Sequence, residues 1–317
     1  MTIDKKFIDI FANVTSLAAL ASFYQVGKKD KIAADKAAVD SMRNELNKIN
    51  MNGEIVIGEG ELDQAPMLFI GEKLGTFKGP FFDIAVDPLE GTNFAANNMP
   101  GALSVMAIAE KDNLFNSPET YMDKIAVGNV GKDVVDLDNS IKKNISNLAE
   151  AKNKKISDIT ACLLDRPRHK KIINELTDLK VKLKLITDGD VSGALLVSDK
   201  KYNVDIFLGI GGGPEGVLAA SALDSFNCEF QARFIFKDKK DIFRAKKMGI
   251  LDLNKKYNLK EIIKGDSIFC ATGITSGDLV DGIKVEKDHF ISHTFVTHKG
   301  SNTKKIISTT KLIKLDK

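Results

Sequence analysis

The stretch ITACLLDRPRHKKIINELTDLKVKLKLITDGDVSGALLVSDKKYNVDIFLGIGGGPEGVLAASAL, residues 159–223, decides the fold class. Apolar runs that predict strands alternate here with helical patterns: strands at 159–164, 181–186 and 204–210, and helices at 168–179 and 217–223. Strands that alternate with helices indicate a sheet covered by helices. We therefore expect an α/β protein built as a layered sandwich.

The rest of the chain predicts elements of both types. They are amphipathic helices at 7–24 and 31–48, strands at 54–57 and 81–86, a helical or strand-like run at 102–109, and a hairpin around 299–302. Pro88 is expected to end the strand at 81–86. The polar segment 138–157 is the predicted boundary between two halves, 1–155 and 156–317.

Composition restricts the class of protein. The 317 residues include 46 basic and 43 acidic side chains without a basic arm or block, which argues against nucleic-acid or membrane-surface binding. No apolar run approaches the ~20 residues that span a bilayer, and the start lacks a signal-peptide pattern. Cys162, Cys228 and Cys270 are too scattered to predict disulfides or a zinc–thiolate site, so we expect a cytoplasmic protein.

Acidic residues collect where apolar runs end. They are Glu59, Glu61 and Asp63, then Asp87 and Glu90, then Asp188 and Asp190, and Glu215. Strand ends converge on crevices in open α/β sheets, so these carboxylates are expected to share one pocket unless they are simply solvated loop residues. Carboxylates in one pocket repel one another unless a cation neutralises them, and an oxygen-only ligand set favours Mg²⁺ or Mn²⁺.

Residues 87–92, DPLEGT, form the most informative short motif. Gly91 allows a sharp turn after Pro88, so that Asp87 and Glu90 are expected to face one metal with the Thr92 hydroxyl nearby. A metal at this point binds phosphate oxygen and lowers the pKa of a bound water. The alternative is an Asp-Pro turn that leads to an N-capping threonine.

Two further motifs predict phosphate binding. Residues 209–216, GIGGGPEG, lie between a strand and a helix, where backbone N–H groups favour phosphate, and we expect Glu215 to be a metal ligand there. The match to G-x-G-x-x-G leaves a dinucleotide fold as an alternative, which the Glu215 charge disfavours. Arg166 and Arg168 flank Pro167 and are expected to clamp a phosphate unless they are plain surface residues.

The remaining polar side chains are less informative. Tyr121 is able to stack on a sugar, although a half-buried core tyrosine is the commoner case. His289, His293 and His298 are spaced unlike a catalytic pair or a zinc site, so we expect structural or exposed roles for them. Nucleophilic serine and cysteine motifs are missing from the sequence.

Together the motifs resemble those of the bacterial class II fructose-1,6-bisphosphatases, within the lithium-sensitive, metal-dependent phosphatase superfamily. The resemblance covers nearly the whole chain and is carried by an ordered set of segments: 14–20, 30–35, 57–68, 86–92, 121–124, 166–169, 188–191, 212–217 and 271–275. It implies an α-β-α-β-α layered sandwich, with 1–155 as the metal-binding half and 156–317 as the sugar-phosphate-binding half. It also implies a homo-oligomer, a dimer or tetramer.

The resemblance implies the site residues as well. Asp35 and Glu59 resemble ligands of one metal, and Asp87, Glu90 and Glu215 ligands of a second, so two or more Mn²⁺ or Mg²⁺ ions are expected. Glu61 and Asp63 are expected to be needed for activity, and Thr92 with Lys31 to surround the attacking water. Implied substrate contacts are Glu90, Gly91, Thr92, Tyr121, Arg166, Pro167, Arg168, Asp188, Gly189, Asp190 and Gly212.

The implied activity is metal-assisted hydrolysis of fructose 1,6-bisphosphate to fructose 6-phosphate and phosphate, a step of gluconeogenesis. Three residues depart from the family pattern: Ser16 where glutamate is usual, Ile32 where asparagine is usual, and Lys36 where glycine is usual. A lysine at 36 is expected to weaken or tune the neighbouring metal site. The alternatives are a sedoheptulose-1,7-bisphosphatase, a dual-specificity bisphosphatase, or a catalytically weak relative that binds sugar phosphates.

Overall fold

The computed structural model describes residues 2–58 and 68–313. The chain divides into two compact units. Unit 1 comprises Met1–Leu114 and Gly265–Lys317, and unit 2 comprises Phe115–Lys264.

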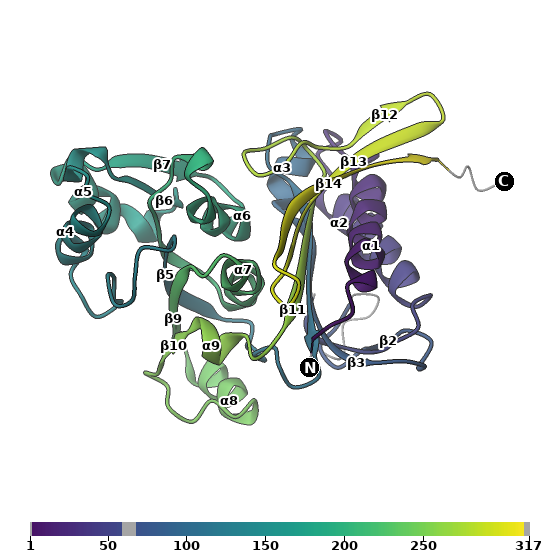
Figure 1. Ribbon diagram of the computed structural model, residues 1–317, viewed down its shortest axis with the longest axis horizontal. Helices are drawn as coiled ribbons and strands as arrows, with labels where there is room; N and C mark the ends of the chain where they lie inside the picture. Colours follow the sequence, from purple (N-terminus) through teal and green to yellow (C-terminus); the bar gives the residue numbers. More distant parts are fainter. Residues whose placement is uncertain (1, 59–67, 314–317) are drawn as a thin grey trace. The chain divides into compact units, whose positions relative to one another are not determined.

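Unit 1 is built on an eight-stranded mixed sheet. The strand order is β12-β13-β11-β4-β3-β1-β2, with β14 paired to β13. The strands are β1 (Asn52–Ile57), β2 (Lys73–Leu74), β3 (Phe81–Glu90), β4 (Leu103–Glu110), β11 (Ser267–Gly273), β12 (Lys284–Glu286), β13 (His289–His298) and β14 (Thr303–Leu312). Helices α1 (Lys6–Phe23) and α2 (Lys31–Leu46) pack against each other and the same sheet, and the short α3 (Thr92–Ala96) follows β3 (Figure 1).

Helix α1 is the central core helix of unit 1. Phe7, Phe11, Val14 and Ala18 recur at helical spacing and are buried against β11, β13 and β4. By length and apolar composition, α1 is also the one helix in the described part of the chain that is able to cross a membrane. Its burial against the sheet and α2 is the arrangement of a core helix, which accounts for this apolar composition.

Unit 2 is built on a six-stranded sheet with helices on both faces. The strand order is β10-β9-β5-β8-β6-β7. The strands are β5 (Tyr121–Val127), β6 (Thr160–Leu164), β7 (Lys182–Ile186), β8 (Ile206–Gly212), β9 (Glu229–Ile235) and β10 (Lys256–Asn258). The helices are α4 (Ile141–Ala151), α5 (Lys170–Asp178), α6 (Asp190–Leu195), α7 (Gly213–Ser225), α8 (Lys239–Lys247) and α9 (Leu259–Ile262).

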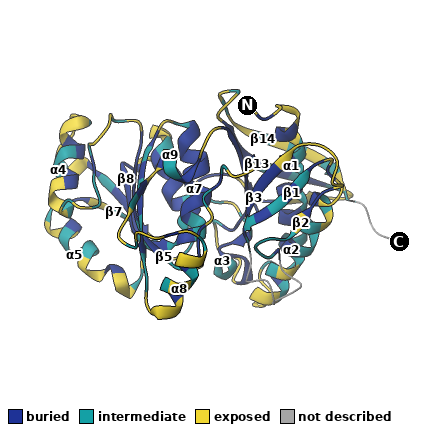
Figure 2. Ribbon diagram, turned by 90° about the horizontal axis from the view of Figure 1, so that it is seen from below, coloured by how far each residue is buried: buried dark blue, intermediate teal, exposed yellow. Residues whose placement is uncertain are grey.

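Helices α4 and α5 cover one face of this sheet and α6 and α7 the other, as Figure 1 shows. Helix α7 is buried along almost its whole length, whereas α4 and α5 present exposed outer faces (Figure 2). The inner faces of α4 and α5 carry apolar residues such as Leu148 and Leu176, which pack on Ile125 and Leu163 of the sheet. Helix α7 is therefore buried on nearly all sides, whereas α4 and α5 are amphipathic helices that bury one face against the sheet of unit 2.

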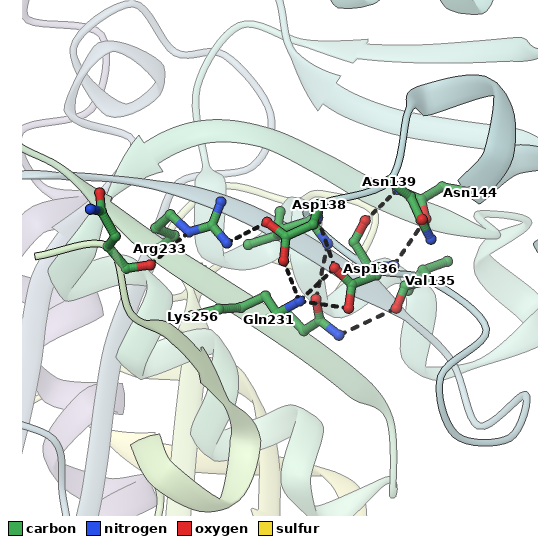
Figure 3. A network of polar contacts seen from close by, with 10 residues as sticks. Val135, Asp136, Asp138, Asn139, Asn144, Gln231, Arg233 and Lys256 are labelled. Carbon is green, nitrogen blue, oxygen red and sulfur yellow. Dashed lines mark hydrogen bonds and ion pairs between the residues drawn. The ribbon is translucent and has the colours of Figure 1, made fainter. Parts of the chain in front are cut away.

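A polar network fixes the loop between β5 and α4 (Figure 3). The Lys256 ammonium bonds both oxygens of Asp136, at 2.5 and 2.6 Å, and Asp138 at 2.8 Å. The Arg233 guanidinium donates to Asp138 at 2.5 Å. Hydrogen bonds from Lys256 and Arg233 lower the pKa of Asp138 to about 2. Because Arg233 lies on β9 and Lys256 on β10, the loop is held against the edge of the sheet.

The α/β class is confirmed, and the predicted helices and strands are present with small shifts at their ends. Two expectations are corrected. Strand β3 continues through Pro88, because one extra residue in β3 opposite β4, between Asp87 and Glu90, accommodates a residue without an N–H group. The segment 138–157, predicted as the boundary between two halves, holds α4 within unit 2, and Ile145 and Leu148 of this helix are buried.

The two units also differ from the predicted halves 1–155 and 156–317. The chain leaves unit 1 after Leu114 and returns at Gly265 because β11 completes the first sheet by pairing with β4 over seven residue pairs, from Ser267↔Ala109 to Gly273↔Leu103. Strands so distant in sequence leave no local pattern that predicts their pairing. The composition of segment 138–157 therefore gave the wrong domain boundary.

A buried carboxylate ties the N-terminus of unit 1 to its sheet. Asp266 accepts hydrogen bonds from the backbone N–H groups of Ile3 at 2.9 Å and Gly300 at 2.7 Å, and from His298 Nε2 at 2.8 Å. The side chains of His298 and Asp266 are 0% and 7% exposed. One side chain thus joins the start of α1, the end of β13 and the turn into β14.

We predict that Asp266→Ala lowers the free energy of unfolding by about 3 kcal/mol, because the buried His298 side chain and the backbone N–H groups of Ile3, Ser267 and Gly300 lose their acceptor. The matched control is Asp288→Ala, which removes a similar His–Asp contact of 2.7 Å whose side chains are 44% and 69% exposed. We expect a cost below about 0.5 kcal/mol for the control. Urea unfolding of both variants measures the difference, and equal stabilities would contradict the prediction.

Candidate active site

The bulge in β3 positions the two acids of the DPLEGT motif. Asp87 pairs with Val105 of β4, and Glu90 pairs with Leu103, so two residues of β3 lie opposite one residue of β4 between them. Asp87 is half-buried and Glu90 is 4% exposed. A buried carboxylate beside a second carboxylate suits a hard cation, because both side chains supply oxygen ligands.

Gly91 turns the chain from β3 into α3. Its φ of 80° lies in the left-handed region, and a Cβ atom there would approach the Phe94 ring to 2.8 Å. Thr92, half-buried, is the first residue of α3. The backbone N–H groups of Phe94 and Ala95 bond the Gly91 carbonyl, so the structure has the tight turn that the motif predicted.

Helix α2 carries Asp35 and Lys31. Asp30 caps the helix by accepting from the Ala33 N–H at 2.9 Å, and Lys31 is exposed in the first turn. Burial raises the pKa of Asp35. This helix contacts both β3 and α3, so all described acids predicted as metal ligands in unit 1 come from adjoining elements.

The three departures from the family pattern have local explanations. Lys36 extends along α2 and forms an ion pair with Asp40 at 2.7 Å. Ile32 is 81% exposed on the same helix. Ser16 is buried on α1, and its hydroxyl lies 2.6 Å from that of Ser292 in β13. The ammonium of Lys36 is therefore paired one helical turn beyond its own position.

The acidic loop that carries Glu59, Glu61 and Asp63 lies outside the described residues. Within 2–58 and 68–313, no group of three or more histidine, cysteine or carboxylate side chains has the arrangement to hold a metal ion. The described acids of unit 1, which are Asp35, Asp87 and Glu90, nevertheless fit a hard cation in chemistry, since they are oxygen donors that burial disfavours as free charges. The full ligand set stays a prediction.

Unit 2 gathers a second set of predicted residues at one end of its sheet. Asp190 begins α6 after Gly189, whose φ is 84°, and Gly212 ends β8. The Lys124 ammonium bonds the Asp190 carboxylate and donates to the Gly212 carbonyl at 2.8 Å. Lys124 is 2% exposed, and its role was not foreseen from the sequence.

The glycine loop leads into α7 and Glu215. Burial raises the pKa of Glu215; Asp190 and Asp188 raise it further, whereas the Lys124 ammonium opposes the effect. The Gly213 N–H donates to the carbonyl of Thr120 at 2.8 Å, so this amide of the loop is already hydrogen-bonded within the protein. Because Asp87 and Glu90 belong to unit 1 and Glu215 to unit 2, their joint coordination of one ion stays a prediction.

The arginine motif is held by a buried histidine. His169 is 1% exposed; its Nδ1 lies 2.7 Å from the Leu164 carbonyl, and its Nε2 accepts from the Ile210 N–H at 2.7 Å. The histidine thereby ties the 3₁₀ turn Pro167–His169 to β6 and β8. Arg166 lies 3.8 Å from Asp188, which places two of the predicted substrate contacts together.

Tyr121 at the start of β5 is flanked by two cations. The Arg168 guanidinium lies 5.0 Å and the Lys237 ammonium 4.1 Å from the centre of the Tyr121 ring. Arg168 Nε also donates to the Ile210 carbonyl at 2.9 Å. Neither cation forms an ion pair with a carboxylate of the described chain. Both side chains therefore place positive charge beside the Tyr121 ring.

Comparison with known proteins identifies the family. The chain matches the family described as "Bacterial fructose-1,6-bisphosphatase, glpX-encoded" over residues 6–311. It is 39% identical to fructose-1,6-bisphosphatase 1 class 2 of Escherichia coli K12 over 92% of this chain and 91% of that protein. It is 37% identical to the D-fructose 1,6-bisphosphatase class 2/sedoheptulose 1,7-bisphosphatase of Trichodesmium erythraeum, over 93% of both chains.

Among solved structures, the inositol monophosphatase from Anabaena aligns with a TM-score of 0.32 and 15% identity, over 61% of this chain and 71% of that one. Overlap at that level adds nothing to the assignment, which rests on the sequence relatives. Since the family match spans nearly the whole chain and the relatives are matched along nearly their whole length, this protein belongs to the bacterial class 2 fructose-1,6-bisphosphatases.

Proposed function

We propose that this chain hydrolyses fructose 1,6-bisphosphate to fructose 6-phosphate and inorganic phosphate. Within a bisphosphatase family, the observation that carries the proposal is the convergence of Arg168 and Lys237 on Tyr121. A bisphosphate has a second phosphate remote from the reacting one, and two cations beside an aromatic ring suit a phosphate attached to a sugar. Sedoheptulose 1,7-bisphosphate is the second candidate, because one relative carries that activity in its name.

The reacting phosphate is assigned to the acidic residues. Enzymes of this superfamily are generally metal-dependent, and we assign two or more Mn²⁺ or Mg²⁺ ions to Asp35, Glu59, Asp87, Glu90 and Glu215. A bound divalent ion neutralises phosphoryl oxygens and lowers the pKa of water. Thr92 follows the Gly91 turn, and we assign its hydroxyl to orient a water, with Lys31, Glu61 and Asp63 as further partners.

The remaining predicted contacts orient the sugar. Asp188 and Asp190 offer carboxylate acceptors for sugar hydroxyls, and the ion pairs of these two acids with Arg166 and Lys124 fix their positions. Such fixed acceptors favour one substrate pose. We also propose a cytoplasmic homo-oligomer; the burial of Cys162, Cys228 and Cys270 suits a reducing compartment.

The first test is phosphate release from fructose 1,6-bisphosphate with Mn²⁺, with Mg²⁺ and with EDTA. We expect release that requires metal and stops with EDTA, because the proposed water activation depends on a bound cation. Sedoheptulose 1,7-bisphosphate and an inositol monophosphate are run in parallel. Equal release from the inositol phosphate would overturn the bisphosphate assignment, and no release with any metal would overturn the activity.

The metal assignment is tested with Asp35→Asn, beside Glu59→Gln and Asp87→Asn. Loss of a direct ligand should lower kcat at least about 100-fold, more than is usual for groups that only support a ligand, while circular dichroism stays unchanged. The matched control is Asp40→Asn, which lies on the same helix and pairs with Lys36 at 2.7 Å. Near-normal turnover in the three ligand variants would contradict the assignment.

The remote-phosphate assignment is tested with Lys237→Gln. We expect KM for fructose 1,6-bisphosphate to rise about 10- to 100-fold, the loss of one charge-assisted contact. Hydrolysis of fructose 1-phosphate, which lacks the remote phosphate, should change less than about two-fold. Lys239→Gln is the control, since Lys239 is an exposed lysine two residues away that lies over no aromatic ring of the described residues. Equal effects on both substrates would refute the role of Lys237.

A further inference from the structure

Lys124 is a lysine in the middle of β5 whose side chain is buried. It lies on β5 between Met122 and Ala126 on the same face of the sheet, and it is among the largest fully buried side chains of the protein. Burial of an ammonium group costs several kcal/mol unless it is paired and hydrogen-bonded. Its partners are the Asp190 carboxylate, which is 10% exposed, and the Gly212 carbonyl.

The glycines around Lys124 show that this arrangement is closely packed. A Cβ atom on Gly211 would overlap the Asp190 carboxylate, and one on Gly212 would overlap the Glu215 carboxylate. A Cβ atom on Gly216 would approach Lys124 Cδ to 3.2 Å. These glycines thus leave room for the Asp190 and Glu215 carboxylates and for the Lys124 side chain to lie against the backbone.

We propose that Lys124 is the resident cation of the acidic cluster of unit 2, a positioning residue that keeps Asp190 and Glu215 in place. It neutralises Asp190 and, through the Gly212 carbonyl, fixes the turn from which α7 and Glu215 start. Asp190 is consequently reserved for a sugar hydroxyl and is not a metal ligand. The part of this inference that concerns substrate rests on the proposed function, whereas the part that concerns metal does not.

Removal of the Lys124 charge should change Mn²⁺ affinity in the opposite direction from a loss of folded structure. Removal of the ammonium leaves Asp190 and Glu215 as adjacent carboxylates without their fixed cation, and such a pair attracts a divalent ion. A variant without the charge should therefore gain affinity for Mn²⁺, while it loses affinity for the substrate because Asp190 is no longer held. A change that only loosened the fold would weaken both.

The test compares Lys124→Met, which removes the charge at similar length, with Lys124→Arg, which keeps it. We expect Lys124→Met to bind Mn²⁺ at least about ten-fold more tightly in calorimetry without substrate, and to raise KM for fructose 1,6-bisphosphate at least about ten-fold. Lys124→Arg should bind Mn²⁺ as the parent does. Unchanged or weaker Mn²⁺ binding by folded Lys124→Met would overturn the proposal.

A double-mutant cycle with Asp190→Asn tests whether Lys124 acts through Asp190. The effect of Lys124→Met on KM should fall below about three-fold in the Asp190→Asn background, and additive effects would refute the coupling. Lys152→Met controls for stability, because it removes an ammonium that pairs with the buried Asp205 at 2.7 Å elsewhere in unit 2. If the parent fails to hydrolyse the bisphosphate, the proposed function fails, and the Mn²⁺ comparison still decides the role of Lys124.

Discussion

The candidate site depends on carboxylates held in partly buried positions, at the end of β3 and on the helices α2, α6 and α7. Uncompensated, such groups repel one another, and burial favours their neutral forms, as the raised pKa values of Asp35 and Glu215 show. In unit 2 a side chain of the protein itself, the Lys124 ammonium, neutralises the Asp190 carboxylate. In unit 1 the described acids Asp35, Asp87 and Glu90 supply oxygen donors, which suit an external hard cation.

A β-bulge and two glycines with positive φ determine where these acids lie in the chain. The extra residue of β3 sets Asp87 and Glu90 at adjacent points of one strand end, and it tolerates Pro88 because a bulge lacks a ladder hydrogen bond there. Gly91 and Gly189 then turn the chain with positive φ values into the elements that carry Thr92 and Asp190. In both units a glycine with φ near 80° follows a strand and precedes a short helix, so the candidate site residues Thr92 and Asp190 each begin a helix close to a strand end.

The sequence predicted most elements because their signals are local. Helical periodicity marked α1 and α2, and apolar runs marked β6, β7 and β8. The pairing of β4 with β11, the bulge at Pro88 and the amphipathic α4 within a polar segment depend on tertiary contacts or on a weaker pattern. The candidate site residues were predicted from the acids, glycines and arginines and from the family resemblance. Lys124, Lys237 and His169 instead have contacts with partners distant in sequence. Segment 121–124 was recognised only as part of the family resemblance, which gave no role to Lys124.

The departures near Asp35 raised the possibility of an inactive relative, and the structure removes its main motivation. A lysine weakens a metal site only if its ammonium approaches the ligand oxygens, because the repulsion falls with distance and with exposure to water. The Lys36 ammonium instead lies 2.7 Å from Asp40, and both side chains are about half exposed. Ile32 is 81% exposed and uncharged, so it exerts no electrostatic repulsion on a bound cation. Ser16 is hydrogen-bonded inside the core with Ser292, so its effect falls on the packing of α1 against β13. The pattern of substitutions therefore changes the surroundings of the acids and leaves their own chemistry intact.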